Sequence, residues 1–409
     1  MHSEFDVIVV GAGPAGSVAA LRLARAGLRV RLLDRAAFPR DKLCGDTLNP
    51  GSLAILDGIG GPSRLRQGYG EARQSAGGAA AAGPPVSLGD RVRARALRTT
   101  GMTVTGPGHA SVSADYPGGL VGAALSRRDL DALLVEAAVD AGVQFDPGVR
   151  VQEPMRAADG VRVTGVRVIC GGRSHVLHSR MVVAADGRGS RLASALKLAR
   201  FAGAPRRWAY GAYFAGVAGL TSRGEMHIRS DGYVGVAPLP GGIANICAVR
   251  AGAGAHAPPA HVLASAIAVD PLLRDRCAGA SRIADVTVLG PLAVESRATG
   301  CPGLLLAGDA AGFVDPMTGD GLRFALRGGE LAADAAVREL DSGAPSFETL
   351  AADRAREFGG KWLLNRALRS LVGSPRALDA AALIARYWSA PVEYLIGVAG
   401  DVSLAQPRA

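Results

Sequence analysis

Phe5-Asp-Val-Ile-Val-Val-Gly-Ala-Gly-Pro-Ala-Gly16 is the stretch that decides the fold of this chain. Its first half is apolar and mostly β-branched, which predicts a buried strand. Its second half has the spacing Gly-x-Gly-x-x-Gly, and residues 17–26 carry Ala, Leu and Arg at helical spacing. Gly27 ends that helix, and a second apolar run, residues 29–33, leads to Asp34. Strand, glycine-rich turn, helix, strand and acid in this order predict a dinucleotide-binding βαβ unit.

Each residue of this fingerprint has a physical task. Gly11 permits the tight turn, Gly13 lets a pyrophosphate approach the backbone, and Gly16 lets the helix lie close to the strand. The helix start around Ala15 offers unpaired N–H groups and a partial positive charge to phosphates. Asp34 can accept hydrogen bonds from ribose hydroxyls, and it offers no positive charge to a 2′-phosphate. A plain glycine-rich turn would explain the strand and the helix but not this acid.

Length and composition bound the class of protein. A chain of 409 residues with 48% hydrophobic residues can form two or three domains or one large interleaved fold. No apolar run reaches the roughly 18 residues of a membrane span, and the N-terminus has the pattern of a strand rather than an export signal. The cysteines are scattered without CxxC spacing, at Cys44, Cys170, Cys247, Cys277 and Cys301. We therefore expect a cytoplasmic protein without a disulfide framework or a metal site.

The net charge of +10 comes almost entirely from arginine, since lysine occurs only at positions 42, 197 and 361. Heavy use of Arg, Ala and Gly is typical of a GC-rich coding sequence. The arginines are spread along the chain without a basic block interleaved with aromatic residues, so we expect no nucleic-acid partner. A positive field still favours anionic partners or a membrane surface.

Later segments predict the remaining elements. A helix begins at Ser126, a plausible N-cap with Asp129 in capping-box position. A buried strand over residues 181–185 ends on Asp186, and an apolar strand over residues 304–307 is followed by Gly308-Asp309. We further expect a short helix at 51–58, a low-complexity surface loop at 74–85, β-like runs at 86–112, a β-meander at 149–177, helices at 260–277 and about 320–340, and a mostly helical tail at 346–400.

Three motifs in this order resemble the flavoprotein superfamily with the p-hydroxybenzoate hydroxylase fold. They are the Gly11–Gly16 turn with Asp34, the Asp186-Gly187 pair, and residues 303–321 (GLLLAGDAAGFVDPMTGDG) before a long helix. Together with SRRDLDALLVEAA at 126–138, they cover most of residues 1–340. The resemblance implies FAD as the cofactor.

The resemblance also assigns residues to the two halves of FAD. Asp309, after Gly308, resembles the acid that binds the ribityl hydroxyls. Gly319, Gly321 and Leu322 would start a helix that points N–H groups at the flavin N1/O2 edge, which stabilises the anionic reduced flavin. Pro316 would fix the approach to that helix. The remaining cofactor contacts implied by the resemblance are Arg35, Arg127 and Asp186, the last near the pyrophosphate and the path of a nicotinamide donor.

Phe38-Pro-Arg-Asp-Lys-Leu-Cys-Gly-Asp46 resembles the F-P-R-x-K-x-C-G stretch of the geranylgeranyl reductase group, whose members reduce C=C bonds of long apolar molecules. This resemblance implies that Cys44 lies close to the isoalloxazine and takes part in catalysis. The alternative is a small buried apolar residue. Arg40 and Lys42 would bind phosphate on FAD or substrate, or would be solvated loop charges.

One stretch departs from the pattern of that group. Its reductases carry Y-x-W-x-F-P, whereas this chain has Tyr233-Val-Gly-Val-Ala-Pro238. Tyr233 remains as a candidate catalytic residue, but Gly235 and Ala237 replace two rings and open space above the flavin. We therefore expect a different, bulkier or ring-containing substrate. The absence of Trp-x-Trp-x-Ile-Pro argues against a flavin halogenase.

The predicted fold is α/β: a Rossmann-type FAD-binding domain with an inserted β-sheet substrate domain and a helical C-terminal tail. We assign residues 1–75, 120–200 and 280–345 to the FAD domain, 76–119 and 201–279 to the substrate domain, and 346–409 to the tail. The basic amphipathic stretch 361–371 either lies on a membrane surface or covers a core.

We expect an FAD-dependent oxidoreductase that reduces or oxidises a C=C bond of a large apolar, isoprenoid-, quinone- or polyketide-like substrate by hydride transfer at flavin N5. NADPH or NADH would be the electron donor, without a binding domain of its own. A monooxygenase acting on an aromatic or polyketide product is the first alternative, and a flavin electron-relay protein is the second. The substrate, the donor and the oligomeric state are left open by the sequence.

Overall fold

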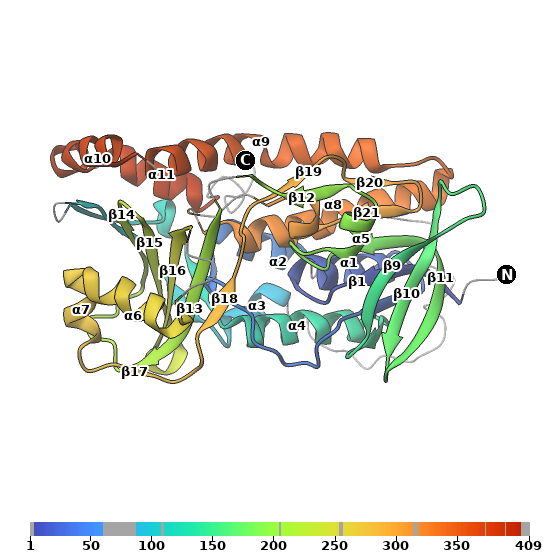
Figure 1. Ribbon diagram of the computed structural model, residues 1–409, viewed down its shortest axis with the longest axis horizontal. Helices are drawn as coiled ribbons and strands as arrows, with labels where there is room; N and C mark the ends of the chain where they lie inside the picture. The colour runs from blue at the N-terminus through green and yellow to red at the C-terminus, as the bar shows by residue number, and fades with distance from the viewer. Residues whose placement is uncertain are drawn as a thin grey trace.

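The computed structural model describes residues 4–59, 87–107, 110–203, 206–252, 257–313, 317, 319–372, 374–388 and 390–401. Two large β-sheets lie beside each other, and the C-terminal helices run along one side of both (Figure 1). The expected loop at 74–85 and Pro316 lie outside the described residues. The predicted α/β fold class is confirmed.

The first sheet has a parallel centre that begins with the fingerprint strand. β1 pairs in parallel with β2 on one side and β11 on the other, and β11 continues in parallel to β21. In spatial order the main path is β20 (Gly300–Cys301), β21 (Leu304–Leu306), β11 (Arg173–Ala184), β1 (Phe5–Val10), β2 (Val30–Leu33) and β8 (Gln144–Asp146). The predicted βαβ unit is therefore present, with α1 (Pro14–Arg25) between β1 and β2.

Glycines let the helices of this half pack close to the turn and to each other. A Cβ on Gly16 would lie 1.8 Å from the Gly11 carbonyl oxygen, so α1 could not approach β1 with any side chain there. A Cβ on Gly329 would lie 2.3 Å from the Ala15 carbonyl oxygen, so glycine also permits α8 (Gly321–Ser342) to cross α1 closely. The apolar faces of α1, α8 and α4 (Arg127–Asp140) form one buried core with the sheet.

Several local predictions for this half are confirmed. The short helix is α2 (Pro50–Ile59), and the meander is β9 (Arg150–Arg156), β10 (Val163–Cys170) and β11. Ser126 caps α4: its Oγ accepts from the Asp129 backbone N at 3.1 Å and donates to the Asp129 carboxylate at 2.6 Å. The long helix after the Gly308-Asp309 motif is α8.

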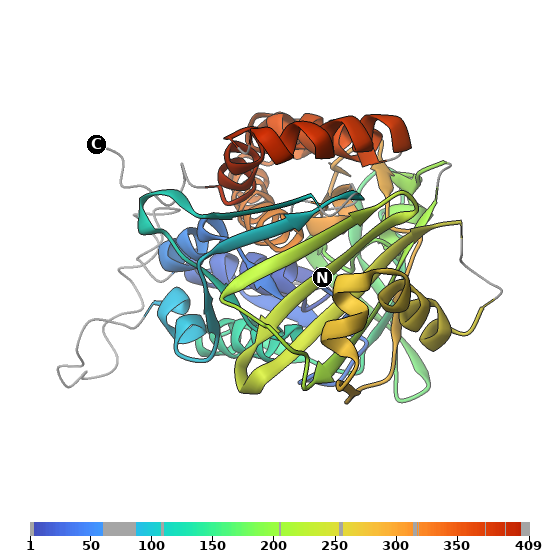
Figure 2. The same ribbon diagram turned by 90° about the vertical axis from the view of Figure 1, so that its left-hand side faces the viewer.

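The second sheet is mostly antiparallel and lies on the left of Figure 1. Its spatial order is β17 (Ser281–Arg282), β13 (Arg207–Ala215), β16 (Ile243–Ala251), β15 (Gly232–Leu239), β14 (Arg223–Arg229), β5 (Gly101–Thr105) and β6 (Ser111–Asp115), with β18 (Thr287–Leu289) also paired to β13. The helices α6 (Pro259–Val269) and α7 (Pro271–Cys277) cover its outer face (Figure 2). The domain division stays a prediction, and the pairing of β17 and β18 supports a last boundary after Leu289 rather than at 280.

Two local predictions were wrong. Residues 86–112 are not all β-like, because α3 (Leu88–Arg93) precedes β4 (Leu97–Thr99), and the Ser87 Oγ caps it by accepting from the Asp90 backbone N at 3.0 Å. Residues 260–277 form two helices rather than one. Asp270 ends α6 and caps α7 through its carboxylate, and Pro271 cannot donate the backbone hydrogen bond that a continuous helix requires.

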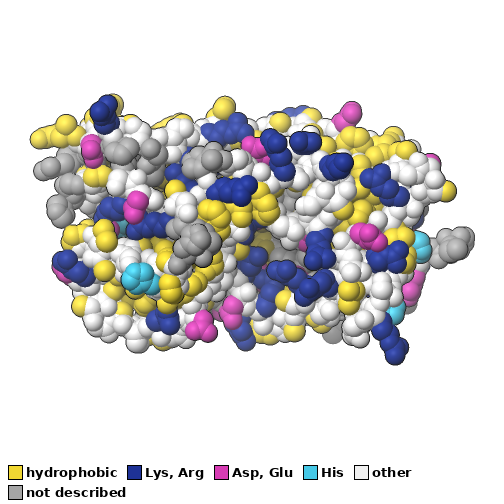
Figure 3. All heavy atoms as spheres, in the orientation of Figure 1, with side chains coloured by type: hydrophobic (Ala, Val, Ile, Leu, Met, Phe, Trp, Pro, Cys, Tyr) yellow, Lys and Arg dark blue, Asp and Glu magenta, His cyan; other side chains and the backbone are white. Residues whose placement is uncertain are grey.

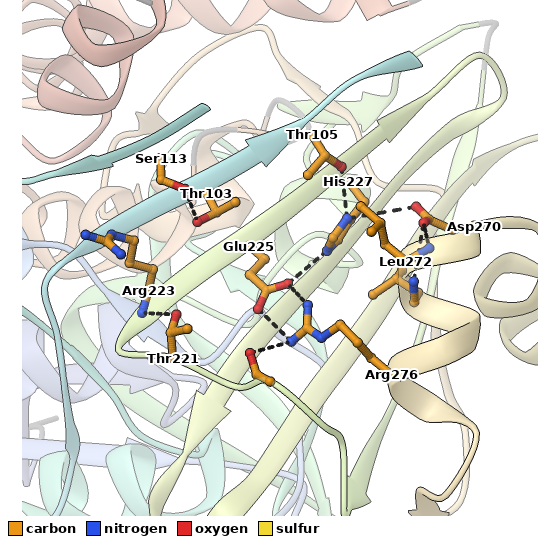
Figure 4. Close-up of polar contacts among 12 residues, drawn as sticks. Thr103, Thr105, Ser113, Thr221, Arg223, Glu225, His227, Asp270, Leu272 and Arg276 are labelled. Carbon is orange, nitrogen blue, oxygen red and sulfur yellow. Dashed lines mark hydrogen bonds and ion pairs between the residues drawn. The ribbon is translucent and has the colours of Figure 1, made fainter. Parts of the chain in front are cut away.

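A buried polar network joins the outer face of this sheet to the loop and helix that cover it (Figure 4). Both ring nitrogens of His227 form hydrogen bonds: Nε2 lies 3.0 Å from the Glu225 carboxylate, and Nδ1 lies 2.9 Å from the Thr105 hydroxyl. Glu225 also binds both terminal nitrogens of Arg276 on α7, and Asp270 lies 3.9 Å from His227. The network satisfies buried polar groups and fixes α7 against β14.

Two small sheets complete the strand inventory. β3 (Thr47–Leu48) and β4 both pair with β7 (Gly122–Ala124), and β12 (Ala199–Phe201) pairs with β19 (Val294–Ser296). β3 directly follows the Cys44 loop, so the first of these sheets holds the end of that loop beside α4.

The tail is helical, as predicted: α9 (Phe347–Val372), α10 (Pro375–Tyr387) and α11 (Ala390–Ala399). Within the described part of the chain, no helix has the length and apolar character needed to span a bilayer. The tail is fixed to the first half by a buried ion cluster. Lys361 Nζ lies 2.7 Å from the Asp320 carboxylate and 2.6 Å from that of Asp401. Asn49 donates to the same Asp320 oxygen at 3.1 Å, so three distant segments meet just before α8 begins.

Replacing Lys361 by Met should strongly destabilise the protein, because the Asp320 carboxylate is 1% exposed and would lose its cationic partner. Removing one partner of a buried pair costs about 3–5 kcal/mol, so the free energy of unfolding from urea denaturation should fall by about that amount. Arg356→Met is the control, because Arg356 is on the same helix with a side chain 79% exposed, and it should change stability by less than about 0.5 kcal/mol. Equal losses in the two variants would contradict the role of the cluster.

Candidate active site

A cavity of about 500 Å³ lies between the two sheets and collects the residues that the sequence singled out. Figure 3 shows a hollow near the centre of this face with Lys and Arg side chains beside it. Of the predicted cofactor and catalytic residues, those that line the cavity are Gly11, Gly13, Ala15, Asp34, Arg35, Arg40, Cys44, Arg127, Asp186, Tyr233, Gly308, Asp309, Gly319, Gly321 and Leu322. Gly16 instead lies under the turn, against Gly11. Their individual roles stay predictions.

The glycine-rich turn has the shape of an anion-binding site. Gly11 has φ +97°, and a Cβ there would lie 2.5 Å from the Ala185 carbonyl oxygen, so only glycine fits. Gly13 faces two guanidinium groups, since a Cβ on it would lie 3.7 Å from Arg127 Nη2 and 3.8 Å from Arg40 Nη2. A phosphate at the start of α1 would therefore meet backbone N–H groups and arginine together.

One buried acid positions both arginines. Arg127 Nε and Nη2 each lie 2.8 Å from an oxygen of the Asp131 carboxylate, and Arg40 Nη1 lies 3.0 Å from the same group. Asp131 is fully buried on α4. Asp131 was not among the predicted site residues, although its spacing of four from Arg127 on a helix is a recognisable ion-pair spacing.

Asp34 is held with its carboxylate beside the turn. Its Oδ2 accepts from the Ala12 backbone N at 2.8 Å and its Oδ1 from the Ala36 backbone N at 2.9 Å. Arg40 approaches it only to 3.9 Å. The carboxylate is thus oriented by the backbone at the end of β2, where the fingerprint requires an acid for the ribose.

Two further acids face the cavity from the other strands. Burial raises the pKa of Asp186, against the Ser190 hydrogen bond and the charge of Arg35. Its Oδ2 accepts from the Arg191 backbone N at 3.1 Å, and its Oδ1 is buried without a partner among the described residues. Burial also raises the pKa of Asp309, against the charges of Arg188 and Lys42. Such acceptors fit a ligand with several hydroxyl donors, as the ribityl and ribose groups of FAD provide.

Of the basic side chains at this end, Arg127 is buried, and Arg40, Lys42 and Arg188 are half-buried. Burial, with Arg127 and Arg188 nearby, lowers the pKa of Lys42 to about 8, so its charge is carried at a cost that an anionic ligand would relieve. The start of α8 also lines the cavity, through Gly319, Gly321 and Leu322. Gly319 has φ +76°, and the helix proper begins at Gly321, within one residue of the start predicted at about 320.

The Cys44 loop is held by a residue that the sequence analysis quoted but did not assign. Asp46 is fully buried with φ +54°, and it accepts three hydrogen bonds: from the Arg127 backbone N at 3.2 Å, the Tyr213 hydroxyl at 2.9 Å and Asn245 Nδ2 at 2.7 Å. Asn245 Nδ2 also donates to the Cys44 carbonyl oxygen at 2.6 Å. Burial raises the pKa of Asp46 to about 7, although Tyr213 and Arg127 both oppose the shift.

The far end of the cavity is apolar and is built on β15. Tyr233, Gly235 and Ala237 alternate along the strand and all line the cavity, with Met226 and Leu292 opposite. A Cβ on Gly235 would meet nothing closer than 3.9 Å, so this position has room for a larger side chain. The missing rings at 235 and 237 therefore leave space inside the cavity, as predicted. Cys44 lies between the two ends, and burial raises the pKa of its thiol.

The pH dependence of stability should report on Asp46. Its pKa rises from 3.8 to about 7 on folding, so between these values the folded state holds a proton that the unfolded state has released. Wild type should therefore lose stability relative to Asp46→Asn as pH rises through this window, by on the order of 4 kcal/mol. Urea denaturation of both proteins across the window checks this, and a constant difference would contradict it.

Comparison with known proteins agrees with this geometry. Residues 4–256 match the family model described as FAD binding domain. The chain is 31% identical to the menaquinone reductase of Mycobacterium tuberculosis, over 91% of this chain and 85% of that protein. It is 30% identical to digeranylgeranylglycerophospholipid reductase 2 of Methanopyrus kandleri, over 88% of this chain and 84% of that protein.

Among solved structures, a flavin-dependent brominase, Bmp2, superimposes with a TM-score of 0.78 at 19% identity, over 97% of this chain and 94% of that one. At this identity the likeness concerns the fold alone. The family match, the extent of the reductase relatives and the glycine-rich cavity agree, and the chain belongs to the FAD-binding oxidoreductase family that includes these menaquinone and digeranylgeranylglycerophospholipid reductases.

Proposed function

We propose that this protein reduces a C=C bond of a large, apolar, isoprenoid-type substrate. The observation that carries the proposal is that one cavity is lined both by the glycine-rich turn with its basic groups and by the apolar cluster around Tyr233 and Leu292. We call these its basic end and its apolar end, and Cys44 also lines the cavity. The basic end suits the dinucleotide half of FAD, and the apolar end suits a hydrocarbon chain or a ring. Reduced FAD supplies a hydride from N5 when bound, and the chain places the substrate and the proton.

The residues at the basic end would hold FAD. The turn at Gly11 and Gly13 with Arg127 would take the pyrophosphate, Asp34 the ribose, and Asp309 the ribityl hydroxyls. The start of α8 would place N–H groups at the N1/O2 edge, where negative charge develops on reduction. Each of these groups lines the cavity.

Cys44 is the candidate for the proton that completes the reduction. Its raised pKa keeps the thiol protonated at neutral pH. Hydride addition to one carbon of a C=C bond leaves the other carbon to be protonated, and the thiol would give that proton and regain one from solvent. Asn245 holds the Cys44 carbonyl oxygen and is itself held by Asp46, so the Cys44 backbone is anchored beside the cavity.

The substrate class follows from the relatives and from the cavity. The names of two relatives specify menaquinone and a digeranylgeranyl lipid, both of which carry isoprenoid chains. The open space at Gly235 and Ala237 supports a substrate that is bulky where it meets the flavin, such as a quinone ring with a prenyl chain. NADPH or NADH is the proposed donor of the electrons.

Such a substrate resides in membranes, and the C-terminal helices have a surface that suits contact with a membrane. Exposed apolar and aromatic side chains gather on α10 and α11, and they are Leu383, Ile384, Tyr387, Trp388 and Tyr394. Arg366 and Arg376 are exposed on α9 and α10. In Figure 3 the α10 end, at the upper left, shows projecting hydrophobic atoms beside basic ones. Aromatic groups with nearby arginines fit an anionic lipid interface.

Flotation with phosphatidylglycerol vesicles tests this surface. Wild type should float with the vesicles, and Tyr387→Ser/Trp388→Ser should bind them at least tenfold more weakly, because each aromatic group lost removes buried area at the interface. Val161→Ser is the control, because Val161 is 59% exposed on the turn between β9 and β10, and these strands lie at the opposite end of the molecule from α10 (Figure 1). Unchanged flotation of the double variant would rule out this contact.

A monooxygenase is the second candidate, favoured by the enlarged space at Gly235 and Ala237. The requirement for oxygen distinguishes a monooxygenase from a reductase. Protein reduced with dithionite under anaerobic conditions should convert a short-chain menaquinone or a geranylgeranyl lipid to a product two hydrogens heavier. Product that forms only with oxygen, and carries an oxygen atom from it, would replace the reductase by a monooxygenase. Reoxidation of the flavin by a quinone without C=C reduction would indicate a relay.

Variants at Gly235 test whether the substrate binds in the apolar end of the cavity. Gly235→Trp should abolish most single-turnover product while the bound FAD is still reduced by dithionite, because the indole would occupy the apolar end. Gly235→Ala is the matched control, since its Cβ fits without contact below 3.9 Å, and it should keep activity within about twofold. Full activity of the Trp variant would show that the substrate binds elsewhere.

A further inference from the structure

A second cavity, of about 380 Å³, opens beside the first and has no place in the proposed chemistry. It lies between α5 (Arg191–Ala195), β12 and β19. Arg188 lines both cavities, and Ala310, which lines the second, follows Asp309, which lines the first. The two cavities are therefore neighbours that share one arginine.

The second cavity is strongly cationic. Arg188, Lys197, Arg200 and Arg297 line it, and none of the described residues that line it is acidic. Arg200 is partly neutralised by Glu295 at 2.9 Å. Lys197 and Arg297 make no ion pair with any residue in the described ranges of the chain. Their charges are thus available to a ligand.

Lys197 is an unusual residue for its place. It is one of only three lysines in the chain, and its φ is +57°, a conformation in which glycine is the common choice. The other two lysines lie in the first cavity, as Lys42, and in the ion cluster of Lys361. Each of the three lysines therefore lies either in a cavity or in an ion cluster.

The cavity also carries one exposed aromatic side chain. Phe201, at the end of β12, lines it and is 43% exposed. An accessible aromatic face stacks on a flat base such as adenine, whereas lysine and arginine bind phosphate. A site for both a base and a phosphate fits a nucleotide better than it fits a phospholipid headgroup.

We propose that this second cavity binds the adenosine-phosphate part of the nicotinamide dinucleotide donor, with Lys197 and Arg297 on its phosphates and Phe201 against its adenine. The proposal rests on the proposed function, because a reductase requires an electron donor. Arg188, between the cavities, lies where a dinucleotide bound in the second would pass toward the first. No second glycine-rich βαβ unit is needed, because side chains supply the phosphate contacts.

The test uses the full FAD-loaded protein and follows flavin reduction by NADPH and by NADH under anaerobic conditions. Lys197→Glu/Arg297→Glu should raise the apparent Kd for the donor at least tenfold, with the limiting reduction rate, the FAD content and dithionite reduction unchanged. Arg173→Glu is the control, because Arg173 is exposed at the tip of the β10–β11 hairpin, and it should leave the Kd within twofold.

A parallel arm measures binding of phosphatidylglycerol vesicles and of inorganic phosphate to the same variants. Loss of vesicle binding with unchanged donor Kd would assign the cavity to a lipid headgroup and overturn the proposal. An unchanged Kd in the double variant without any other effect would also overturn it. If neither dinucleotide reduces wild type, yet dithionite-reduced protein still reduces the substrate, the donor site is refuted while the proposed function survives.

Discussion

The carboxylate of Asp46 receives hydrogen bonds from both halves of the molecule. The backbone N of Arg127, at the start of α4, belongs to the half with the glycine-rich turn, whereas Tyr213 and Asn245 stand on neighbouring strands of the other sheet. Two residues earlier in the chain, Cys44 is held by the same Asn245. The relative position of the two ends of the cavity therefore depends on one buried acid, which keeps its partners only while both halves are in place.

A second constraint is the arrangement of positive charge around Gly13. Arg40 and Arg127 would repel each other beside the turn, but both form ion pairs with the Asp131 carboxylate. Lys42 and Arg188 add further positive charge to the cavity lining, beside acids such as Asp34 and Asp309. Such partly buried cations favour a polyanion, and the diphosphate of FAD is one.

The predicted site residues that the structure brings to one cavity belong to local motifs. Gly11, Gly13 and Asp34 are recognisable because one short βαβ unit imposes their spacing, and Asp186 and Gly308 follow strands that are apolar throughout. The partners of Asp46 could not be predicted this way, because Tyr213 and Asn245 lie far along the chain, and only the register of β13 against β16 makes them neighbours. The break at Asp270 was visible as Asp-Pro within an apolar run. The helix α3 was missed because alternating Arg and Val favoured a strand, while Ser87 supplied the cap.

The ion cluster around Lys361 makes the two sides of the cavity depend on different lengths of chain. The glycine-rich turn lies within one short continuous segment, since β1, α1 and β2 follow one another directly. The start of α8, however, is fixed by Lys361 on α9 and by Asp401 beyond α11. The α8 side of the cavity therefore acquires its final shape only when α9 and the segment after α11 have docked. Residues that do not line the cavity thus help to shape it.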